Sequence, residues 1–343
     1  MIIVMHPEAT SEEVAQIVER LQDLGADIHI TTDGGRTVVS GTTESRLAEE
    51  APWTDLPGVE RVVPMVRGGR RVGRHFKSED TVVQTMGVRI GDGSLTVAAG
   101  PCAIESREQM LETARLVVTA GAKMIRGDAF KPRTSPYAFQ GLGKAGLEIL
   151  AEVREETGRP VVAEVLDPRE VELVGSYADV LRIGTRNMSN QALLREVGRQ
   201  SKPVMLKRGR ASTIEEWIDA AEYIHNEGNP HIVMVERGIR GFDPSARNTL
   251  DISAVPLVKL ATHLPVMVDP SHAAGRRDLV ASLARAAVAA GADGVMIDVH
   301  PRPEEAMVDG PQALLPDEFE MLMRDLEAVA SVLTSPRASN GQP

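Results

Sequence analysis

Residues 160–207 read PVVAEVLDPREVELVGSYADVLRIGTRNMSNQALLREVGRQSKPVMLK, and this stretch decides the fold. It contains three short, largely apolar runs, at Pro160–Val165, Val180–Ile183 and Pro203–Lys207. Such runs suit parallel strands that are buried on both faces. The stretch therefore predicts strands that alternate with longer connecting segments.

The same alternation extends in both directions from this stretch. The eight apolar runs are Leu95–Ala99, Lys123–Arg126, Pro160–Val165, Val180–Ile183, Pro203–Lys207, Ile232–Glu236, Pro265–Asp269 and Gly294–Asp298. The segments between them include amphipathic stretches at Glu108–Thr119, Gly146–Thr157, Thr213–Glu227 and Leu279–Ala290. Eight successive βα units fit a closed (β/α)8 barrel, the TIM-barrel fold of the α/β class, better than an open sheet.

Residues 1–66 follow a different pattern. The predicted elements are a strand at Ile2–Met5, a helix from Thr10 to about Leu24, strands at Asp27–Thr31 and Thr37–Ser40 around the turn Asp33-Gly34-Gly35, a helix at Thr43–Ala51 and a strand at Val59–Val66. Thr10 and Glu13 have the spacing of a capping box. The order βαββαβ predicts a small ferredoxin-like α+β domain.

Three further segments complete the predicted organisation. Residues 67–80 are basic, contain glycine and lack an apolar period, which favours a linker. The barrel domain, residues 81–333, is expected to begin with a hairpin whose turn is Gly91-Asp92-Gly93. Residues 334–343 are rich in Ser, Pro and Gly, so we expect a disordered tail.

Composition narrows the class of protein. Of the 343 residues, 42% are hydrophobic and 25% charged, which is typical of a globular protein with a sizeable core. The net charge of 38 − 49 = −11 argues against a nucleic-acid or anionic membrane partner. The single cysteine excludes an intramolecular disulfide and fits the cytoplasm. We expect neither a signal peptide nor a membrane span.

In such a barrel the active site lies at the C-terminal ends of the strands. An ionisable side chain lies at or just after the end of nearly every predicted strand. These residues are Cys102, Arg126, Glu164, Arg182, Arg186, Lys207, Arg237, Asp269, His272, Asp298 and His300. One subset is cationic and consists of Arg126, Lys131, Arg133, Arg186, Lys207 and Arg237. Because Arg and Lys match phosphate and carboxylate groups, this subset predicts small anionic substrates with more than one phosphate.

A second subset contains Cys102, His272, Asp298 and Asp309. A thiolate, an imidazole and two carboxylates could hold one divalent first-row metal ion. Their spacing matches no metal motif, so only the barrel arrangement brings them together. The alternatives are a buried structural cysteine and an ordinary loop histidine.

Residues 141–146 spell G-x-G-x-x-G. A dinucleotide-binding loop of this type should directly follow a strand. Here the motif follows the polar loop Lys131–Pro136, so we interpret it as a loop that leads into a helix.

Several of these segments resemble one enzyme family. They are Ala99-Gly100-Pro101-Cys102, Lys131–Pro136, Phe139–Gly143, Lys207-Arg208-Gly209, Glu236-Arg237-Gly238, Asp269-Pro270-Ser271-His272 and Val299-His300-Pro301. The family is 3-deoxy-D-arabino-heptulosonate 7-phosphate (DAHP) synthase, type I-beta, with an N-terminal ferredoxin-like regulatory domain. The resemblance extends from Met1 to about residue 333. It implies condensation of phosphoenolpyruvate with D-erythrose 4-phosphate, the first step of the shikimate route to aromatic amino acids.

The resemblance also implies roles for individual residues. The phosphoenolpyruvate ligands would be Arg126, Lys131, Arg186, Lys207 and Arg237, with the acidic Glu164 nearby. Arg133 and Thr134, in the same loop as Pro132, would hold the aldose phosphate. Lys131 would also donate a proton, and His272 would act in catalysis as a metal ligand. The metal ligands would be Cys102, His272, Asp298 and Asp309, with Mn²⁺ preferred over the alternatives Fe²⁺, Co²⁺, Zn²⁺ and Cd²⁺.

Three positions depart from the family pattern. Asp298 stands where the family usually has Glu, so the metal would shift or gain a water. Asp128 stands where Gly is usual, and its carboxylate would repel substrate or pair with an Arg. Thr185 replaces the usual Ala.

The resemblance further implies an aromatic effector, tyrosine or phenylalanine, bound by the small domain near His29 and Thr31, and a homotetramer. The alternative for this domain is a role in assembly alone. For the whole chain, the alternatives are a synthase that uses another aldose phosphate, such as arabinose 5-phosphate, and a non-catalytic regulatory homologue.

Overall fold

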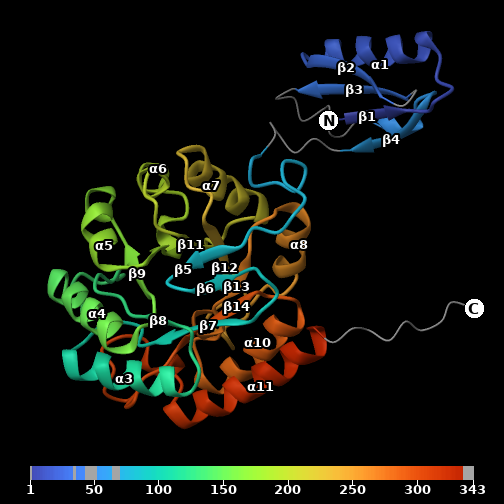
Figure 1. The fold of residues 1–343 in the computed structure, drawn as a ribbon. Coiled ribbons are helices and arrows are strands. Elements are labelled where there is room, and N and C mark those ends of the chain that lie inside the picture. Colours follow the sequence, from blue (N-terminus) through green and yellow to red (C-terminus); the bar gives the residue numbers. More distant parts are fainter. Residues whose placement is uncertain (1, 34–35, 43–51, 64–69, 335–343) are drawn as a thin grey trace, which may run out of the picture. The chain divides into compact units, whose positions relative to one another are not determined.

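The computed structural model describes residues 2–33, 36–42, 52–63 and 70–334 (Figure 1). The chain divides into two compact units, Met1–Phe76 and Lys77–Pro343. Part of the predicted linker (residues 67–69), the predicted helix Thr43–Ala51 and the predicted tail beyond Thr334 lie outside the described residues.

The first unit is a four-stranded antiparallel sheet with the strand order β2-β3-β1-β4. Its described elements are β1 (Ile2–Met5), α1 (Ser11–Asp23), β2 (Asp27–Asp33), β3 (Arg36–Thr42), the 3-10 turn η1 (Trp53–Asp55) and β4 (Val59–Val63). The core forms between α1 and the sheet, where Ile3, Ile17, Leu21 and Val39 are fully or almost fully buried. The predicted ferredoxin-like arrangement is confirmed.

The predicted capping box opens α1. The Thr10 hydroxyl accepts a hydrogen bond from the Glu13 amide at 3.3 Å, and the Thr10 amide donates to the Glu13 carboxylate at 2.7 Å. Each bond satisfies a backbone amide that has no partner within the helix. The helix therefore begins where the sequence predicts.

The second unit is a closed barrel of eight strands in which every neighbouring pair is parallel, including the pair of β9 and β10 that closes the ring. The strands are β7 (Thr96–Gly100), β8 (Met124–Arg126), β9 (Val161–Val165), β10 (Val180–Ile183), β11 (Val204–Lys207), β12 (Ile232–Glu236), β13 (Val266–Val268) and β14 (Gly294–Asp298). All eight predicted strands are confirmed, each to within about one residue at either end.

Helices surround these strands (Figure 1). They are α3 (Arg107–Thr119), α4 (Lys144–Thr157), α5 (Val171–Tyr177), α6 (Gln191–Gly198), α7 (Ile214–Asn226), α8 (Ala254–Ala261), α9 (Pro270–Ala274), α10 (Arg277–Ala289) and α11 (Pro316–Thr334). The four predicted amphipathic stretches correspond to α3, α4, α7 and α10. Among the described residues, no helix combines the length and apolar character that crossing a membrane requires.

A hairpin formed by β5 (Val83–Thr85) and β6 (Val88–Ile90) packs on the barrel interior through Val83, Val88 and Ile90. The predicted turn of this hairpin at Gly91-Asp92-Gly93 is wrong. The strands pair Thr85 with Val88, so the turn is Met86-Gly87, and both residues have positive φ, at 40° and 79°. A two-residue turn of this kind matches the twist of the paired strands. Gly91–Gly93 instead lead into β7.

Candidate active site

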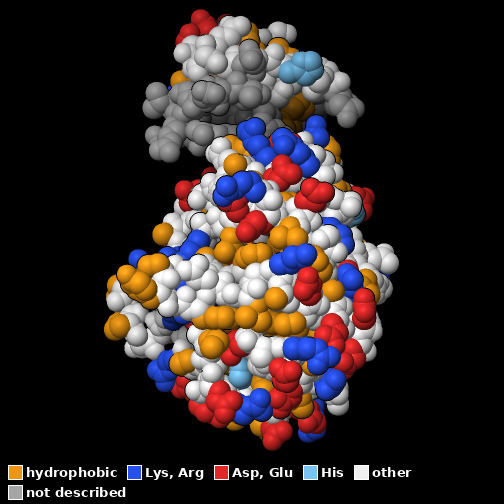
Figure 2. Space-filling model, turned by 90° about the vertical axis from the view of Figure 1, so that its left-hand side faces the viewer, with side chains coloured by type: hydrophobic (Ala, Val, Ile, Leu, Met, Phe, Trp, Pro, Cys, Tyr) orange, Lys and Arg blue, Asp and Glu red, His pale blue; other side chains and the backbone are white. Residues whose placement is uncertain are grey.

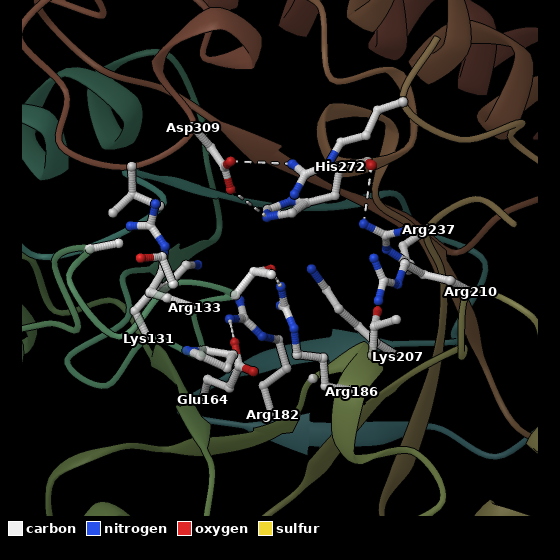
Figure 3. Close-up of a pocket in the computed structure, with 18 residues that line it drawn as sticks. Lys131, Arg133, Glu164, Arg182, Arg186, Lys207, Arg210, Arg237, His272 and Asp309 are labelled. Atoms are coloured by element: carbon white, nitrogen blue, oxygen red, sulfur yellow. Dashed lines mark hydrogen bonds and ion pairs between the residues drawn. The ribbon is translucent and has the colours of Figure 1, made fainter. Parts of the chain in front are cut away.

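A cavity of about 300 Å³ lies among the residues that follow the barrel strands (Figure 3). Its lining includes eight basic side chains: Lys131, Arg133, Arg182, Arg186, Lys207, Arg210, Arg237 and Arg247. The acidic side chains in the lining are Glu164 and Asp309. On the face of the barrel unit shown in Figure 2, by contrast, acidic and basic side chains are interspersed. The cations are thus concentrated in the cavity of an acidic protein.

Four of these arginines have no carboxylate within ion-pair distance among the described residues: Arg133, Arg186, Arg210 and Arg237. Arg133 donates to the Phe139 carbonyl at 3.1 Å. Arg237 donates to the Gly238 and His272 carbonyls at 3.3 and 3.1 Å, and burial lowers its pKa to about 10. We call these four the unpaired arginines. Unpaired guanidinium groups that face a cavity suit a phosphate ligand.

A balanced set of charges, which we call the deep charge cluster, lies partly in the lining of the cavity and partly beneath it. Its cations are Arg126, Lys131 and Arg182, and its carboxylates are Asp128, Glu164 and Asp298. None of the six residues is more than 7% exposed. Each cation therefore already has an acidic partner in the absence of a ligand.

Lys207 ends β11 and pairs with Asp269, which is fully buried. Burial lowers the pKa of Lys207 to about 8, and Arg182 and Arg126 add to that effect, whereas Asp269 opposes it. Lys207 is therefore the cation of the lining whose charge changes most readily above neutral pH.

Cys102, His272 and Asp309 meet at one side of the cavity. The Cys102 Sγ atom lies 3.5 Å from His272 Nε2 and 3.2 Å from Asp309 Oδ2, and His272 Nε2 lies 3.6 Å from Asp309 Oδ2. Metal–ligand bonds of about 2.0–2.3 Å in tetrahedral geometry separate neighbouring ligand atoms by roughly 3.3–3.8 Å. These three side chains therefore fit a single divalent ion.

Asp269 orients the His272 ring. As the residue before α9, Asp269 accepts a hydrogen bond from the His272 amide at 2.9 Å, and its other oxygen lies 2.9 Å from His272 Nδ1. A proton held on Nδ1 leaves Nε2 free to bind a metal. Burial lowers the pKa of His272, although Asp269 and Asp298 oppose this, and the neutral ring is the form that binds metals.

Asp298 lies close to these three side chains, but its carboxylate oxygens accept hydrogen bonds from other residues. Cys102, His272 and Asp298 each offer one ligand atom within 4.8 Å of the others. However, Asp298 Oδ1 accepts a hydrogen bond from Arg126 at 2.8 Å, and Oδ2 accepts one from Gln312 at 2.6 Å. Its nearest approach to the histidine is 3.5 Å, to Nδ1. Its assignment as a fourth ligand stays a prediction.

Most of the predicted site residues lie together. The cavity lining contains Lys131, Pro132, Arg133, Thr134, Glu164, Arg186, Lys207, Arg237, His272 and Asp309. Arg126 differs, because it is fully buried beneath the lining and donates to the Pro101 carbonyl, Asp128 and Asp298. His29 and Thr31 lie on β2, in the other unit.

Arg182, Arg210 and Arg247 also line the cavity but were not among the predicted substrate ligands. Arg182 interrupts the apolar run of β10, and such a buried charge in a strand is a usable signal. Arg210 and Arg247 lie in loops, where the sequence pattern gave no signal.

The glycine motif at residues 141–146 ends the loop that contains Lys131 and Arg133. It packs this end of the loop against Ala129, shortly after β8. Gly141 has a φ of +95°, and a Cβ atom there would lie 2.0 Å from the Ala129 carbonyl oxygen. The Gly143 amide donates to the same oxygen at 2.9 Å. The glycines thus allow the backbone to pack closely against Ala129. This agrees with the interpretation that the motif does not bind a nucleotide.

Gly141→Ala is expected to lower the free energy of unfolding by about 3 kcal/mol, because it combines left-handed strain with a backbone clash. Gly158→Ala is the matched control. Gly158, which follows α4, also has a positive φ, of 64°, in the left-handed region, but no atom lies within 4 Å of a Cβ there. Its cost should be about 1 kcal/mol. Urea unfolding measures both values, and equal costs would show that the close approach to Ala129 is unimportant.

The fold and the cavity are those of a (β/α)8-barrel enzyme whose cationic cavity suits phosphorylated anions. Comparisons with known proteins specify it further. Residues 77–334 match the DAHP synthetase I family, and residues 1–67 match the DAHP synthase ferredoxin-like domain. The chain belongs to the DAHP synthetase I family.

Individual relatives agree with this assignment. The phospho-2-dehydro-3-deoxyheptonate aldolase of Thermotoga maritima is 45% identical over 333 residues, covering 97% of this chain and 98% of that protein. The crystal structure of a T. maritima DAHP synthase matches with a TM-score of 0.79 over 97% of each chain, at 45% identity. A 2-dehydro-3-deoxyphosphooctonate aldolase of Bradyrhizobium sp. strain BTAi1 is 34% identical over 277 residues, or 74% of this chain and 95% of that protein.

Proposed function

We propose that this enzyme condenses phosphoenolpyruvate with D-erythrose 4-phosphate and water to give DAHP and inorganic phosphate, the first step of the shikimate pathway. The observation that carries the proposal is that the unpaired arginines share one cavity with His272 and Asp309, whose side chains lie 3.5 and 3.2 Å from the Cys102 Sγ atom. Two anionic substrates repel each other in water, and a cationic cavity offsets that repulsion and fixes their geometry.

In this proposal the basic residues divide between the two substrates. Arg186, Lys207 and Arg237 hold phosphoenolpyruvate, together with Lys131. Arg133 and Thr134 hold the phosphate of erythrose 4-phosphate, with Pro132 beside them. Arg126 acts from beneath the lining by holding Asp128 and Asp298. Glu164 accepts a hydrogen bond from Arg182 at 2.8 Å and keeps that guanidinium at the cavity wall.

A divalent ion bound by Cys102, His272 and Asp309 would supply a Lewis acid for the aldehyde oxygen. We propose Mn²⁺, with Fe²⁺, Co²⁺, Zn²⁺ and Cd²⁺ as alternatives. Burial raises the pKa of the Cys102 thiol to about 12, so binding of a metal has to displace its proton.

Lys131 supplies the proton. Carbon 3 of phosphoenolpyruvate forms the new bond to the aldehyde carbon, and the aldehyde oxygen takes a proton from Lys131 Nζ. Water then adds to carbon 2 and returns a proton to Lys131. The resulting hemiketal phosphate breaks its bond to the phosphate oxygen, and the departing phosphate takes the hydroxyl proton, which leaves the ketone. Although burial alone would lower the pKa of Lys131, its contact with Asp128 raises that pKa above its usual value. Lys131 therefore carries its proton at neutral pH.

The test is phosphate release from phosphoenolpyruvate that depends on erythrose 4-phosphate, measured with each divalent metal. We expect release to stop on chelation and to return on addition of metal. Full activity after complete removal of metal would contradict the metal requirement. Absence of turnover with every metal would favour the non-catalytic alternative, which the engagement of Asp298 by Arg126 and Gln312 motivates.

A second candidate function is the same chemistry with a longer aldose phosphate. The 34% identity to a 2-dehydro-3-deoxyphosphooctonate aldolase is the observation that favours it. Parallel assays with arabinose 5-phosphate and erythrose 4-phosphate separate the two. We expect kcat/KM to be higher for erythrose 4-phosphate.

Binding of phosphoenolpyruvate is expected to weaken as the pH rises from 7 to 9. An anion prefers the charged form of Lys207, whose pKa is lowered to about 8, so protonated Lys207 is lost above that pH. Affinity should fall by up to about tenfold at pH 9. Calorimetric titration at pH 7, 8 and 9 measures it. Lys207→Gln should lack this step, and an unchanged pH dependence in that variant would assign the step to another group.

We propose that the ferredoxin-like unit binds tyrosine or phenylalanine and thereby regulates the enzyme. His29 and Thr31 are exposed on β2, which is an edge strand of the sheet. Tyrosine is expected to bind the wild type, and His29→Ala should bind at least about tenfold more weakly. Equilibrium dialysis measures both. If the wild type binds neither amino acid, the unit serves assembly alone.

We also propose a homotetramer in the cytoplasm, where the single cysteine thiol stays reduced. Sedimentation equilibrium of the full chain determines the number of subunits.

A further inference from the structure

Asp128 is a fully buried carboxylate that lies between the cations of the deep charge cluster. It follows β8, and its oxygens accept hydrogen bonds from Arg182 at 2.5 and 2.6 Å, from Lys131 at 2.7 Å and from Arg126 at 3.3 Å. Burial alone would raise its pKa, but these cations hold the pKa far below the usual range. Asp128 is therefore a permanent negative charge with three basic neighbours.

Two of those neighbours face the ligand cavity. Lys131 and Arg182 belong to its lining, whereas Asp128 does not. Asp128 thus pairs, from beneath the cavity lining, with two cations that a ligand in the cavity would contact. The unpaired arginines carry no such internal partner.

The two kinds of cation suit different parts of a substrate. A phosphate group can bind the unpaired arginines without displacing a protein carboxylate. The carboxylate of the same substrate would then meet the remaining cations of the lining, which are Lys131, Arg182, Lys207 and Arg247. Lys131 and Arg182 already hold Asp128, Lys207 holds Asp269, and Arg247 lies 3.2 Å from Asp309.

We propose that Asp128 is a specificity-determining residue that sets the affinity for phosphoenolpyruvate by competing, as an internal anion, with the substrate carboxylate for Lys131 and Arg182. The inference rests on the proposed function, because it takes a substrate with both a carboxylate and a phosphate. It assigns Asp128 no contact with the phosphate and no part in bond formation.

Asp128→Asn, which removes the charge and keeps the shape, should bind phosphoenolpyruvate at least tenfold more tightly than the wild type. Binding of inorganic phosphate, which lacks a carboxylate, should change by less than threefold. Calorimetric titrations of the full chain with each ligand, without aldose phosphate, measure both. Asp243→Asn is the control for net charge, because Asp243 is exposed and its side chain accepts a hydrogen bond from the nearby Ser245 amide at 2.8 Å. This control should leave both affinities within twofold.

Two other results would overturn the proposal. If Asp128→Asn strengthens binding of both ligands equally, the effect is one of overall charge. If it weakens binding of phosphoenolpyruvate, Asp128 positions Lys131 and Arg182 for the substrate and does not compete with it.

Removal of a buried carboxylate beside three cations could prevent folding. Asp128→Gly is the second variant, and the same selective gain is expected from it. These are binding measurements, so they are independent of whether turnover with erythrose 4-phosphate is found.

Discussion

His272→Ala is expected to lower Mn²⁺ binding from one ion per chain to less than about one tenth, and turnover by at least about 1,000-fold. The His272 Nε2 atom lies 3.5 Å from Cys102 Sγ and 3.6 Å from Asp309 Oδ2. Its loss removes one of these three ligands, and one of the two that remain is a thiol that burial keeps protonated. A Lewis acid contributes several kcal/mol to a transition state, which corresponds to this factor. Metal analysis of the dialysed protein and steady-state kinetics measure the two effects.

His231→Ala is the matched control, because His231 is exposed and precedes β12 at the opposite end of the strand from the cavity. It should retain both metal and turnover. Stoichiometric Mn²⁺ in His272→Ala would remove His272 from the ligand set even if activity were lost.

Lys131→Met is expected to lower kcat by about 100- to 10,000-fold, the range that a general acid contributes. Met keeps the length and the apolar stem of Lys131 but cannot donate a proton. In the structure Lys131 Nζ donates to Asp128 at 2.7 Å and to the Cys102 carbonyl at 3.0 Å, so it lies between the deep charge cluster and the metal-ligand group. Rapid-quench measurement of a single turnover isolates the chemical step.

Lys144→Met removes an exposed lysine from the first turn of α4, where it pairs with Glu148 at 3.7 Å. Its kcat should stay within twofold of the wild type. A Lys131→Met enzyme with an unchanged single-turnover rate would assign the proton to another donor.

The barrel could be predicted because each strand is a largely apolar run, and burial on both faces leaves little freedom in where such a run begins or ends. The hairpin turn was placed wrongly for a related reason. Gly91-Asp92-Gly93 has the composition of a turn, but the pairing of Thr85 with Val88 puts the reversal at Met86-Gly87, and composition alone does not specify pairing.

The candidate site was predictable in part. The ends of eight parallel strands meet at one rim, so Cys102, His272 and Asp309 could be expected together although they are far apart in sequence. The state of Asp298 could not be predicted. Whether its carboxylate reaches a metal or stays with Arg126 and Gln312 depends on the length of one methylene group and on two partners that no motif specifies.

The cations in and beneath the cavity lining fall into two groups, one exposed to solvent and one buried. Arg186 and Arg210 are exposed, whereas Arg126 and Arg182 are buried and form ion pairs with buried carboxylates. Mobile ions screen charges in water over about 8 Å at physiological ionic strength, but they penetrate poorly into a packed interior. Dissolved salt should therefore weaken the attraction that the outer arginines exert on an approaching anion, while the interior pairs remain unaffected by it.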